Sequence, residues 1–168
     1  MNDNFSDIGN RLSDLGWRVV RSEDQDALSL PQECEERYHW LPGEVIAFLK
    51  SFDLVLSADE KAWFTTCKYL RGDIDSAFAW NQWEKLSLSS AEADGDAEWK
   101  ESIRAFWDEH FPLLLSVKSG YAYIAIRKDL TIVQGSEPEF EGTAPVANDF
   151  SHFLALVAEQ DSSMDPLI

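Results

Sequence analysis

The chain has 168 residues, the usual length of one globular domain. Hydrophobic residues make up 45% and aromatic residues 12%, which excludes a disordered or low-complexity protein. The 31 acidic and 14 basic residues give a formal net charge of −17, which argues against direct binding of nucleic acid phosphates or of an anionic membrane surface. A basic protein is the partner that such a charge favours.

The two cysteines, Cys34 and Cys67, are too few for a disulfide framework, and no Cys-x-x-Cys pair indicates a zinc or redox site. The first residues carry no basic segment followed by an apolar stretch, as a secretory signal would. The apolar runs are only a few residues long, far short of a membrane span. We therefore expect a soluble protein of the reducing cytoplasm.

The first 36 residues predict little regular structure apart from one helix. That helix extends over residues 6–15, with Ser6 as its N-cap and Gly16 as its stop. Residues 22–36 are polar and predict a loop or a short helix. Acidic residues outnumber basic ones throughout this segment, which indicates a negative outer element of the fold.

The next segment predicts a helix and two short strands. The helix begins at Pro42, because proline is tolerated in the first helical turn. The strands are expected over residues 52–56 and 61–66. Between them, Ser57 and Glu60 have the spacing of a capping box, so a helix there is an alternative.

The second half begins with a helix capped by Asp96, which we expect to end just before Pro112 because the residue preceding a proline avoids helical angles. Its apolar positions are Trp99, Ile103, Phe106, Trp107 and His110. A three-stranded antiparallel meander and a last helix, capped by Asn148 or Asp149, follow. The strands of the meander are Leu113–Val117, Tyr121–Arg127 and Thr131–Gln134. The pattern predicts an α+β domain with helices on one side of an antiparallel sheet.

No motif for metal, cofactor or nucleophilic chemistry is present. The imidazole and thiol groups have none of the spacings of a metal site; they belong to Cys34, His39, Cys67, His110 and His152. Gly-x-Ser-x-Gly is absent, and the eight glycines are scattered rather than clustered as in a phosphate-binding loop. We therefore predict no metal and no cofactor.

Carboxylates beside aromatic residues are the remaining candidates for acid–base catalysis. They are Glu84, near Trp80 and Trp83, and Asp108 with Glu109. In a chain with 31 acids such pairs are common, and they are expected more simply as solvated faces of aromatic-rich helices. The sequence therefore favours a protein that is not an enzyme.

Two segments combine acids with aromatic residues in a way that favours binding to a basic protein. The first contributes Asp73, Asp75, Trp80, Trp83 and Glu84, and the second, expected as an exposed loop after the meander, contributes Glu137, Glu139, Phe140 and Glu141. The alternative is that the aromatic side chains face the core while the acids keep the domain soluble.

Several short motifs follow one another between roughly residues 38 and 160. They are Leu41-Pro42 with Phe48-Leu49, Trp63-Phe64-Thr65, Ser76-Ala77-Phe78-Ala79-Trp80-Asn81, Trp107-Asp108-Glu109-His110-Phe111-Pro112, Ser116-Val117-Lys118-Ser119-Gly120-Tyr121-Ala122-Tyr123, Gly135-Ser136-Glu137-Pro138-Glu139-Phe140 and Val146-Ala147-Asn148-Asp149-Phe150. Together they resemble the SUKH superfamily, which includes fungal cell-wall synthesis regulators and many bacterial immunity proteins. Ser51-Phe52-Asp53 departs from the pattern, because many members have an Asn-Gly-Gly or similar turn there.

The resemblance implies a curved antiparallel sheet flanked by helices over residues 38–160. Outside the match we expect an acidic helix and loop extension over 1–37 and a short tail over 161–168. It brings no catalytic residue. In bacteria it implies an immunity protein, a monomer or weak dimer that binds and neutralises a cognate toxin, here expected to be a basic, nuclease-type domain. The alternatives are a regulatory or scaffold protein that binds an endogenous partner, and a small hydrolase that uses Glu84, or Asp108 with Glu109.

Overall fold

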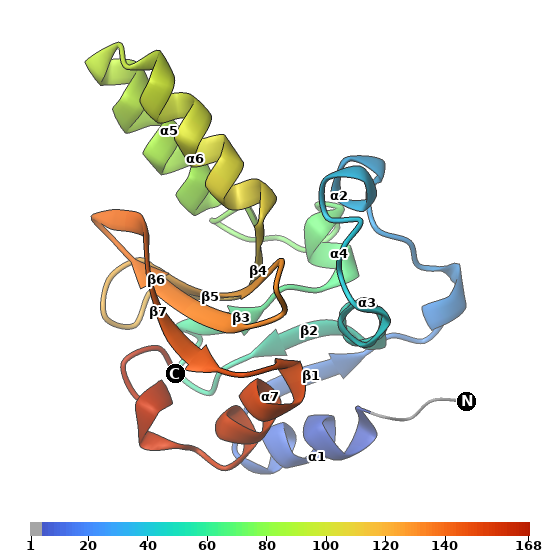
Figure 1. Ribbon diagram of the computed structural model, residues 1–168. Coiled ribbons are helices and arrows are strands. Elements are labelled where there is room, and N and C mark those ends of the chain that lie inside the picture. The colour runs from blue at the N-terminus through green and yellow to red at the C-terminus, as the bar shows by residue number, and fades with distance from the viewer. Residues whose placement is uncertain (1–4) are drawn as a thin grey trace.

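The computed structural model describes residues 5–168 and contains a sheet of seven antiparallel strands in the order of the sequence (Figure 1). The strands are β1 (Arg18–Arg21), β2 (Phe52–Leu56), β3 (Ala62–Phe64), β4 (His110–Ser116), β5 (Ala122–Arg127), β6 (Ile132–Ser136) and β7 (Glu139–Ala147). The helices are α1 (Ser6–Asp14), α2 (Gln32–Arg37), α3 (Gly43–Ser51), α4 (Cys67–Leu70), α5 (Gln82–Asp94), α6 (Ala97–Asp108) and α7 (Phe150–Ala158), with 3-10 helices η1 (Gln25–Ala27) and η2 (Ser162–Met164). The predicted α+β class is confirmed.

The register of the central strands separates their side chains onto two faces. Trp63 lies opposite Leu115, and Leu115 lies opposite Tyr123, so these three share one face. Phe64 and Leu114, the next pair along, point to the other. Every residue of β4 is buried, so both faces are covered. The expectation of helices on one side only is therefore wrong.

One face is covered mainly by phenylalanine side chains, and we call it the phenylalanine face: Phe48, Phe64, Phe150 and Phe153. The ring of Phe48, from α3, lies 5.2 Å from that of Phe64 and 5.4 Å from that of Phe150, measured between centroids. Phe153, from α7, lies 5.8 Å from Phe64. Each of these buried rings contributes roughly 2–3 kcal/mol relative to an exposed one.

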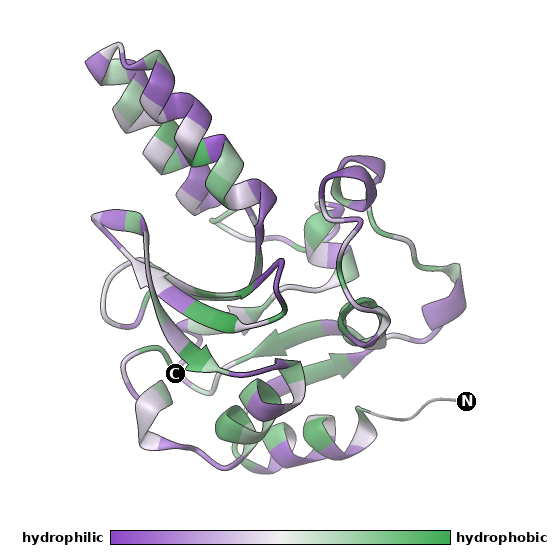
Figure 2. Ribbon diagram, in the orientation of Figure 1, coloured by the Kyte–Doolittle hydropathy of each residue, from purple (hydrophilic) through white to green (hydrophobic). Residues whose placement is uncertain are grey.

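The opposite face, which we call the tryptophan face, carries Trp63, Trp83, Trp107 and Tyr123. It is covered by α5 and α6, an antiparallel pair of helices that extends away from the sheet and that we call the arm (Figure 1). Gly95 ends α5 in the left-handed conformation, with φ of 65°, and so allows the immediate reversal into α6. Polar residues are frequent along the arm, whereas the strands are mostly hydrophobic (Figure 2).

The helices and strands with strong hydrophobic patterns are found where the sequence predicts them. They are α1, α3, β2, β3, the meander β4–β6 and α7, whose cap is Asp149, the acceptor of the His152 backbone N–H. The two helix starts are each displaced by one residue. Ser6, expected as the N-cap of α1, is its first helical residue, and Phe5 is the N-cap. Pro42, expected as the first residue of α3, is instead its N-cap. The alternative helix at Ser57–Glu60 is wrong, because Ser57 Oγ instead accepts from the Ala62 N–H across the β2–β3 turn.

The helix that Asp96 caps ends earlier than predicted. α6 stops at Asp108, and both His110 and Pro112 belong to β4. Pro112 is tolerated in the strand because the β4–β5 register shifts between it and Leu114, at a bulge that needs no proline N–H. His110 stacks on the ring of Phe106, with 3.7 Å between centroids, and burial lowers the pKa of its imidazole.

Three elements lack a sequence signal. The buried positions of α5 are Trp83, Glu84, Ser87 and Ala91, so its inner face contains only one large apolar residue and no hydrophobic period. The last strand, β7, covers the segment predicted as an exposed loop, which is therefore wrong from residue 139 onward. The first strand, β1, is mostly exposed and has the pattern Arg-Val-Val-Arg of an edge strand.

Both ends of the described chain pack against the sheet. The segment expected as an extension over 1–37 contributes β1, which pairs with β2 as far as Val20 and Leu54 before the register shifts. In the expected tail, Leu167 is buried and its carbonyl accepts a hydrogen bond of 2.7 Å from Ser116 Oγ. Both segments are therefore part of the folded domain and are not separate extensions of it.

Candidate functional sites on the tryptophan face

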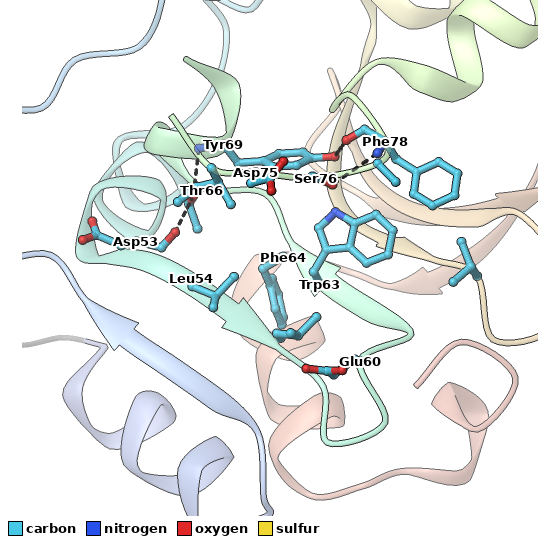
Figure 3. Close-up of a pocket in the computed structure, with 14 residues that line it drawn as sticks. Asp53, Leu54, Glu60, Trp63, Phe64, Thr66, Tyr69, Asp75, Ser76 and Phe78 are labelled. Carbon is cyan, nitrogen blue, oxygen red and sulfur yellow. Dashed lines mark hydrogen bonds between the residues drawn. The ribbon is translucent and has the colours of Figure 1, made fainter. Parts of the chain in front are cut away.

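The first hollow on the tryptophan face lies between β2, β3 and the loop that joins α4 to α5, and we call it the aromatic pocket (Figure 3). Its volume is about 260 Å³. Its apolar walls come from Leu54, Trp63, Ile74 and Phe78. Trp63 and Phe78 stack on each other, with 5.8 Å between ring centroids and 25° between planes.

Hydrogen bonds hold the loop over the aromatic pocket in one position. The hydroxyl of Tyr69 donates to the carbonyl of Phe78, and the Phe78 N–H donates to Ser76 Oγ at 3.2 Å. Thr66 caps α4 by accepting from the Tyr69 N–H at 3.1 Å and donates to the Asp53 carbonyl at 3.2 Å. The pocket is thus formed before any ligand arrives.

Three carboxylates line the aromatic pocket, and no lysine or arginine is among its lining residues. Asp53 is neutralised by Lys68 at 2.8 Å and also accepts from Ser22 at 2.7 Å. Asp75 and Glu60 are exposed and form no ion pair within residues 5–168. Figure 3 shows these two at different edges of the hollow. The pocket therefore combines aromatic walls with an uncompensated negative rim.

The second hollow lies between the arm and the β6–β7 hairpin, and we call it the arm cleft. Its volume is about 650 Å³, and its lining includes Leu86 and Trp99 from the arm and Pro138, Glu139 and Glu141 from the hairpin. Trp99 is 37% exposed, which is unusual for so large an apolar side chain. Aromatic residues are enriched at protein interfaces relative to the rest of the surface.

The floor of the arm cleft holds one partly buried carboxylate. Glu141 accepts a hydrogen bond of 2.9 Å from Ser87 Oγ, which ties β7 to α5. Burial raises the pKa of Glu141 above its ordinary value, and the bond from Ser87 opposes that shift. Glu137 and Glu139, near the tip of the hairpin, are exposed.

Aromatic rings in contact connect the two hollows through the interior. Trp83 lies 5.5 Å from Phe78, which lines the aromatic pocket, and 5.6 Å from Phe140, which lines the arm cleft. The indole and the Phe140 ring are nearly parallel, 3° apart. Trp83 Nε1 donates to the Ala122 carbonyl at 3.0 Å, which fixes the arm on the sheet. Trp83 thus contacts one lining residue of each hollow, although the two hollows have no lining residue in common.

Arg37, the last residue of α2, fastens the base of the arm. Its guanidinium forms two hydrogen bonds to Glu84, of 2.8 and 2.6 Å, and a third of 2.7 Å to Asp108. Burial by itself would lower the pKa of Arg37, but the hydrogen bonds to Glu84 and Asp108 raise this pKa by a larger amount. The net shift of the pKa is therefore upward. The charged guanidinium is therefore strongly favoured, and it bridges α5 and α6.

The candidate binding residues from the sequence separate into a supporting set and a surface set. Buried side chains, which support the hollows, are Trp80, Trp83, Glu84 and Phe140, with Glu84 only 6% exposed. The acids at the surface are Asp73, Asp75, Glu137 and Glu139, with Glu141 half-buried, and Asp73 is paired with Arg71 at 3.6 Å. The alternative that the aromatic residues face the core thus holds for Trp80, Trp83 and Phe140.

Sequence reasoning missed Trp63, Glu60, Arg37 and Trp99 as parts of a site. Trp99 was assigned to the apolar stripe of its helix, and its spacing gave no sign that it borders a cleft. The pairing of Arg37 with Glu84 joins residues 47 positions apart, so no local pattern signals it. Glu60 lies between the two strands expected over residues 52–56 and 61–66, but this position does not specify which face of the sheet the Glu60 side chain reaches.

The structure accounts for one of the carboxylates that the sequence offered as an acid catalyst. The carboxylate of Glu84, once weighed as an acid catalyst, is occupied on both oxygens by Arg37. In residues 5–168 no group of three His, Cys, Asp or Glu side chains is placed to hold a metal ion. Across the same range, no helix has the length and apolar character that crossing a bilayer requires.

Comparisons with known proteins do not place the chain in a family. No family model matches it, and no match is found among curated proteins or solved structures.

Proposed function

We propose that the protein binds a basic protein through the tryptophan face and, as the SUKH resemblance implies, that this partner is a toxin domain which it neutralises. The observation that carries the proposal is the set of exposed, unpaired carboxylates beside two hollows: Asp75 and Glu60 at the aromatic pocket and Glu139 at the arm cleft. Glu137, two residues before Glu139 and near the tip of the same hairpin, adds a further exposed carboxylate. The aromatic surface beside them supplies apolar contact area at an interface.

The proposed mechanism is occlusion of the toxin, with no chemical step. A nuclease-type toxin is basic because it must hold phosphates, so a chain of net charge −17 accelerates the encounter by electrostatic attraction. Rim charges act mainly on the association rate and its salt dependence. Trp99 and Pro138 in the arm cleft are the contacts expected to lengthen the lifetime of the complex.

The test is co-expression with the product of the neighbouring gene. We expect the wild-type chain to relieve growth arrest and to retain that product in a pull-down at low salt, with release at high salt because screening weakens the attraction. The triple variant E137Q/E139Q/E141Q should lose most of the protection. The control D7N/D14N/E159Q makes the same change in net charge at exposed acids of α1 and the end of α7, and should protect like the wild type.

The outcomes separate the proposal from its alternatives. Binding that is insensitive to salt and to the cleft variant would make the acidic surface incidental. Recovery of housekeeping proteins alone would favour the regulatory or scaffold function, with an endogenous partner. Equal loss of protection in the cleft variant and in the control would assign the effect to net charge rather than to the arm cleft.

A further inference from the structure

We infer that the aromatic pocket receives a single arginine side chain, and that the basic partner supplies it. The second half of this inference rests on the proposed function, whereas the first half concerns the chemistry of the pocket alone. It assigns a ligand class, a guanidinium on an alkyl stem, to a hollow that lies apart from the arm cleft.

The charge of the pocket selects a cation. Its lining includes three carboxylates and no basic residue, and Lys68 neutralises only Asp53. Asp75 and Glu60 stay without ion pairs in the described part of the chain. A cation that enters the hollow thus meets two uncompensated carboxylates, while an anion meets repulsion from both.

The walls of the pocket favour a guanidinium over an ammonium ion. A guanidinium is planar, stacks on aromatic faces and is less strongly hydrated than an ammonium, so it loses less on entering an apolar hollow. Trp63 is half-buried and supplies an indole surface, and Leu54 and Ile74 provide apolar contact for the methylene stem. Asp75 can accept two parallel hydrogen bonds from the guanidinium.

The size and rigidity of the pocket limit its occupant. A volume of about 260 Å³ is below the roughly 300–1,000 Å³ of sites for drug-sized ligands, and it suits one long side chain. The loop over it is already held by Tyr69, Ser76 and Phe78, so binding need not order the loop. Preorganisation of this kind makes a small ligand detectable on its own.

The experiment titrates the full-length protein with N-acetyl-arginine amide and follows the indole N–H resonance of Trp63, assigned from the variant Trp63→Phe. We expect a saturable shift with a Kd on the order of 1 mM. N-acetyl-citrulline amide has nearly the same shape without the charge and should bind at least about tenfold more weakly. Equal binding of the two probes would overturn the inference.

Two variants localise the site. D75N should weaken arginine binding at least about fivefold, whereas D73N, at an exposed acid two residues away that is paired with Arg71, should leave it unchanged. E60G should also weaken binding while stabilising the fold, because Glu60 has φ of 62°, a conformation that favours glycine. Unchanged arginine binding in D75N would remove the pocket as the site.

The source of the arginine is tested separately from the pocket. D75N is placed in the co-expression assay, where partial loss of protection is expected. If D75N loses the arginine probe yet protects fully, the partner does not supply the arginine, and that half of the inference fails. The titration needs no partner, so arginine binding by the pocket can be disproved while the cleft variant still abolishes protection. The proposed function is therefore tested independently, by the co-expression assay.

Discussion

The two faces of the sheet solve the problem of burial in different ways. The phenylalanine face is made mainly of rings without polar atoms, which pack on one another with no hydrogen bond to satisfy, with the indole of Trp17 beside Phe64 as an exception. The tryptophan face uses side chains with polar atoms and carries both hollows. Within the described residues, Nε1 of Trp63 and of Trp107 is buried without a hydrogen-bond partner there. This difference is what the proposed function requires: a phenylalanine face that contributes mainly stability and a tryptophan face that is available for binding.

Truncating one ring on each face tests most directly whether the two faces contribute differently to stability and to binding. Phe153→Ala removes a fully buried ring and is expected to lower the free energy of unfolding by about 4 kcal/mol, without affecting arginine binding in the fraction that stays folded. Phe78→Ala, at a half-buried ring, should lower the free energy of unfolding by only about 1–2 kcal/mol but should weaken the binding of N-acetyl-arginine amide. Urea unfolding measures both, and equal costs would contradict the division.

Arg37→Ala tests how the arm is held. It leaves the carboxylate of Glu84, which is 6% exposed, without its partner, and should destabilise the fold by about 3 kcal/mol. The double variant Arg37→Met with Glu84→Met should recover most of that loss, since it removes both charges together. A cost of the single variant below about 1 kcal/mol would show that the pair does not fasten the arm.

Gly135→Ala tests the close packing of the tryptophan face. A Cβ at Gly135 would lie 2.5 Å from the hydroxyl oxygen of Tyr123, whose ring is fully buried and whose hydroxyl donates to the Phe140 carbonyl. Displacing this ring should cost about 2 kcal/mol. The control Gly43→Ala, where no atom lies within 4 Å of the added Cβ, should be neutral or slightly stabilising in the same thermal unfolding measurement.

The smallest effect is expected for E141Q, which tests how the partly buried carboxylate of Glu141 affects the stability of the fold. Burial raises the pKa of this carboxyl in the folded state above its ordinary value of 4.5, so its stabilising contribution is present below that value and is lost as the pH rises through the folded-state pKa. E141Q should therefore raise stability by about 0.5 kcal/mol at neutral pH and by nothing in acid. An equal effect at both pH values would contradict this origin.

Elements with a clear hydrophobic period were predictable, and those that build the site were less so. The alternation of Tyr121 and Tyr123 with Ala122 and Ile124 located β5 from sequence alone. The arm was only half predicted, because the inner face of α5 is built on Glu84 and small side chains whose partners lie elsewhere in the chain.

The candidate site was predicted by its composition and not by its geometry. Glu137 and Glu139 were expected at the surface and lie there, but Phe140 turns inward because β7 extends the sheet and brings it onto Trp83. Tertiary contact thus decided which aromatic residues are exposed. Trp99, on the apolar stripe of α6, is 37% exposed because it borders the arm cleft and does not pack in the core.

The most direct test of recognition through the tryptophan face is calorimetric titration of the purified product of the neighbouring gene into three forms of this protein. The forms are wild type, the cleft variant E137Q/E139Q/E141Q and the charge-matched control D7N/D14N/E159Q. We expect the cleft variant to lose at least about tenfold in affinity and the control less than about twofold. Equal losses in both variants, or none in either, would contradict the account.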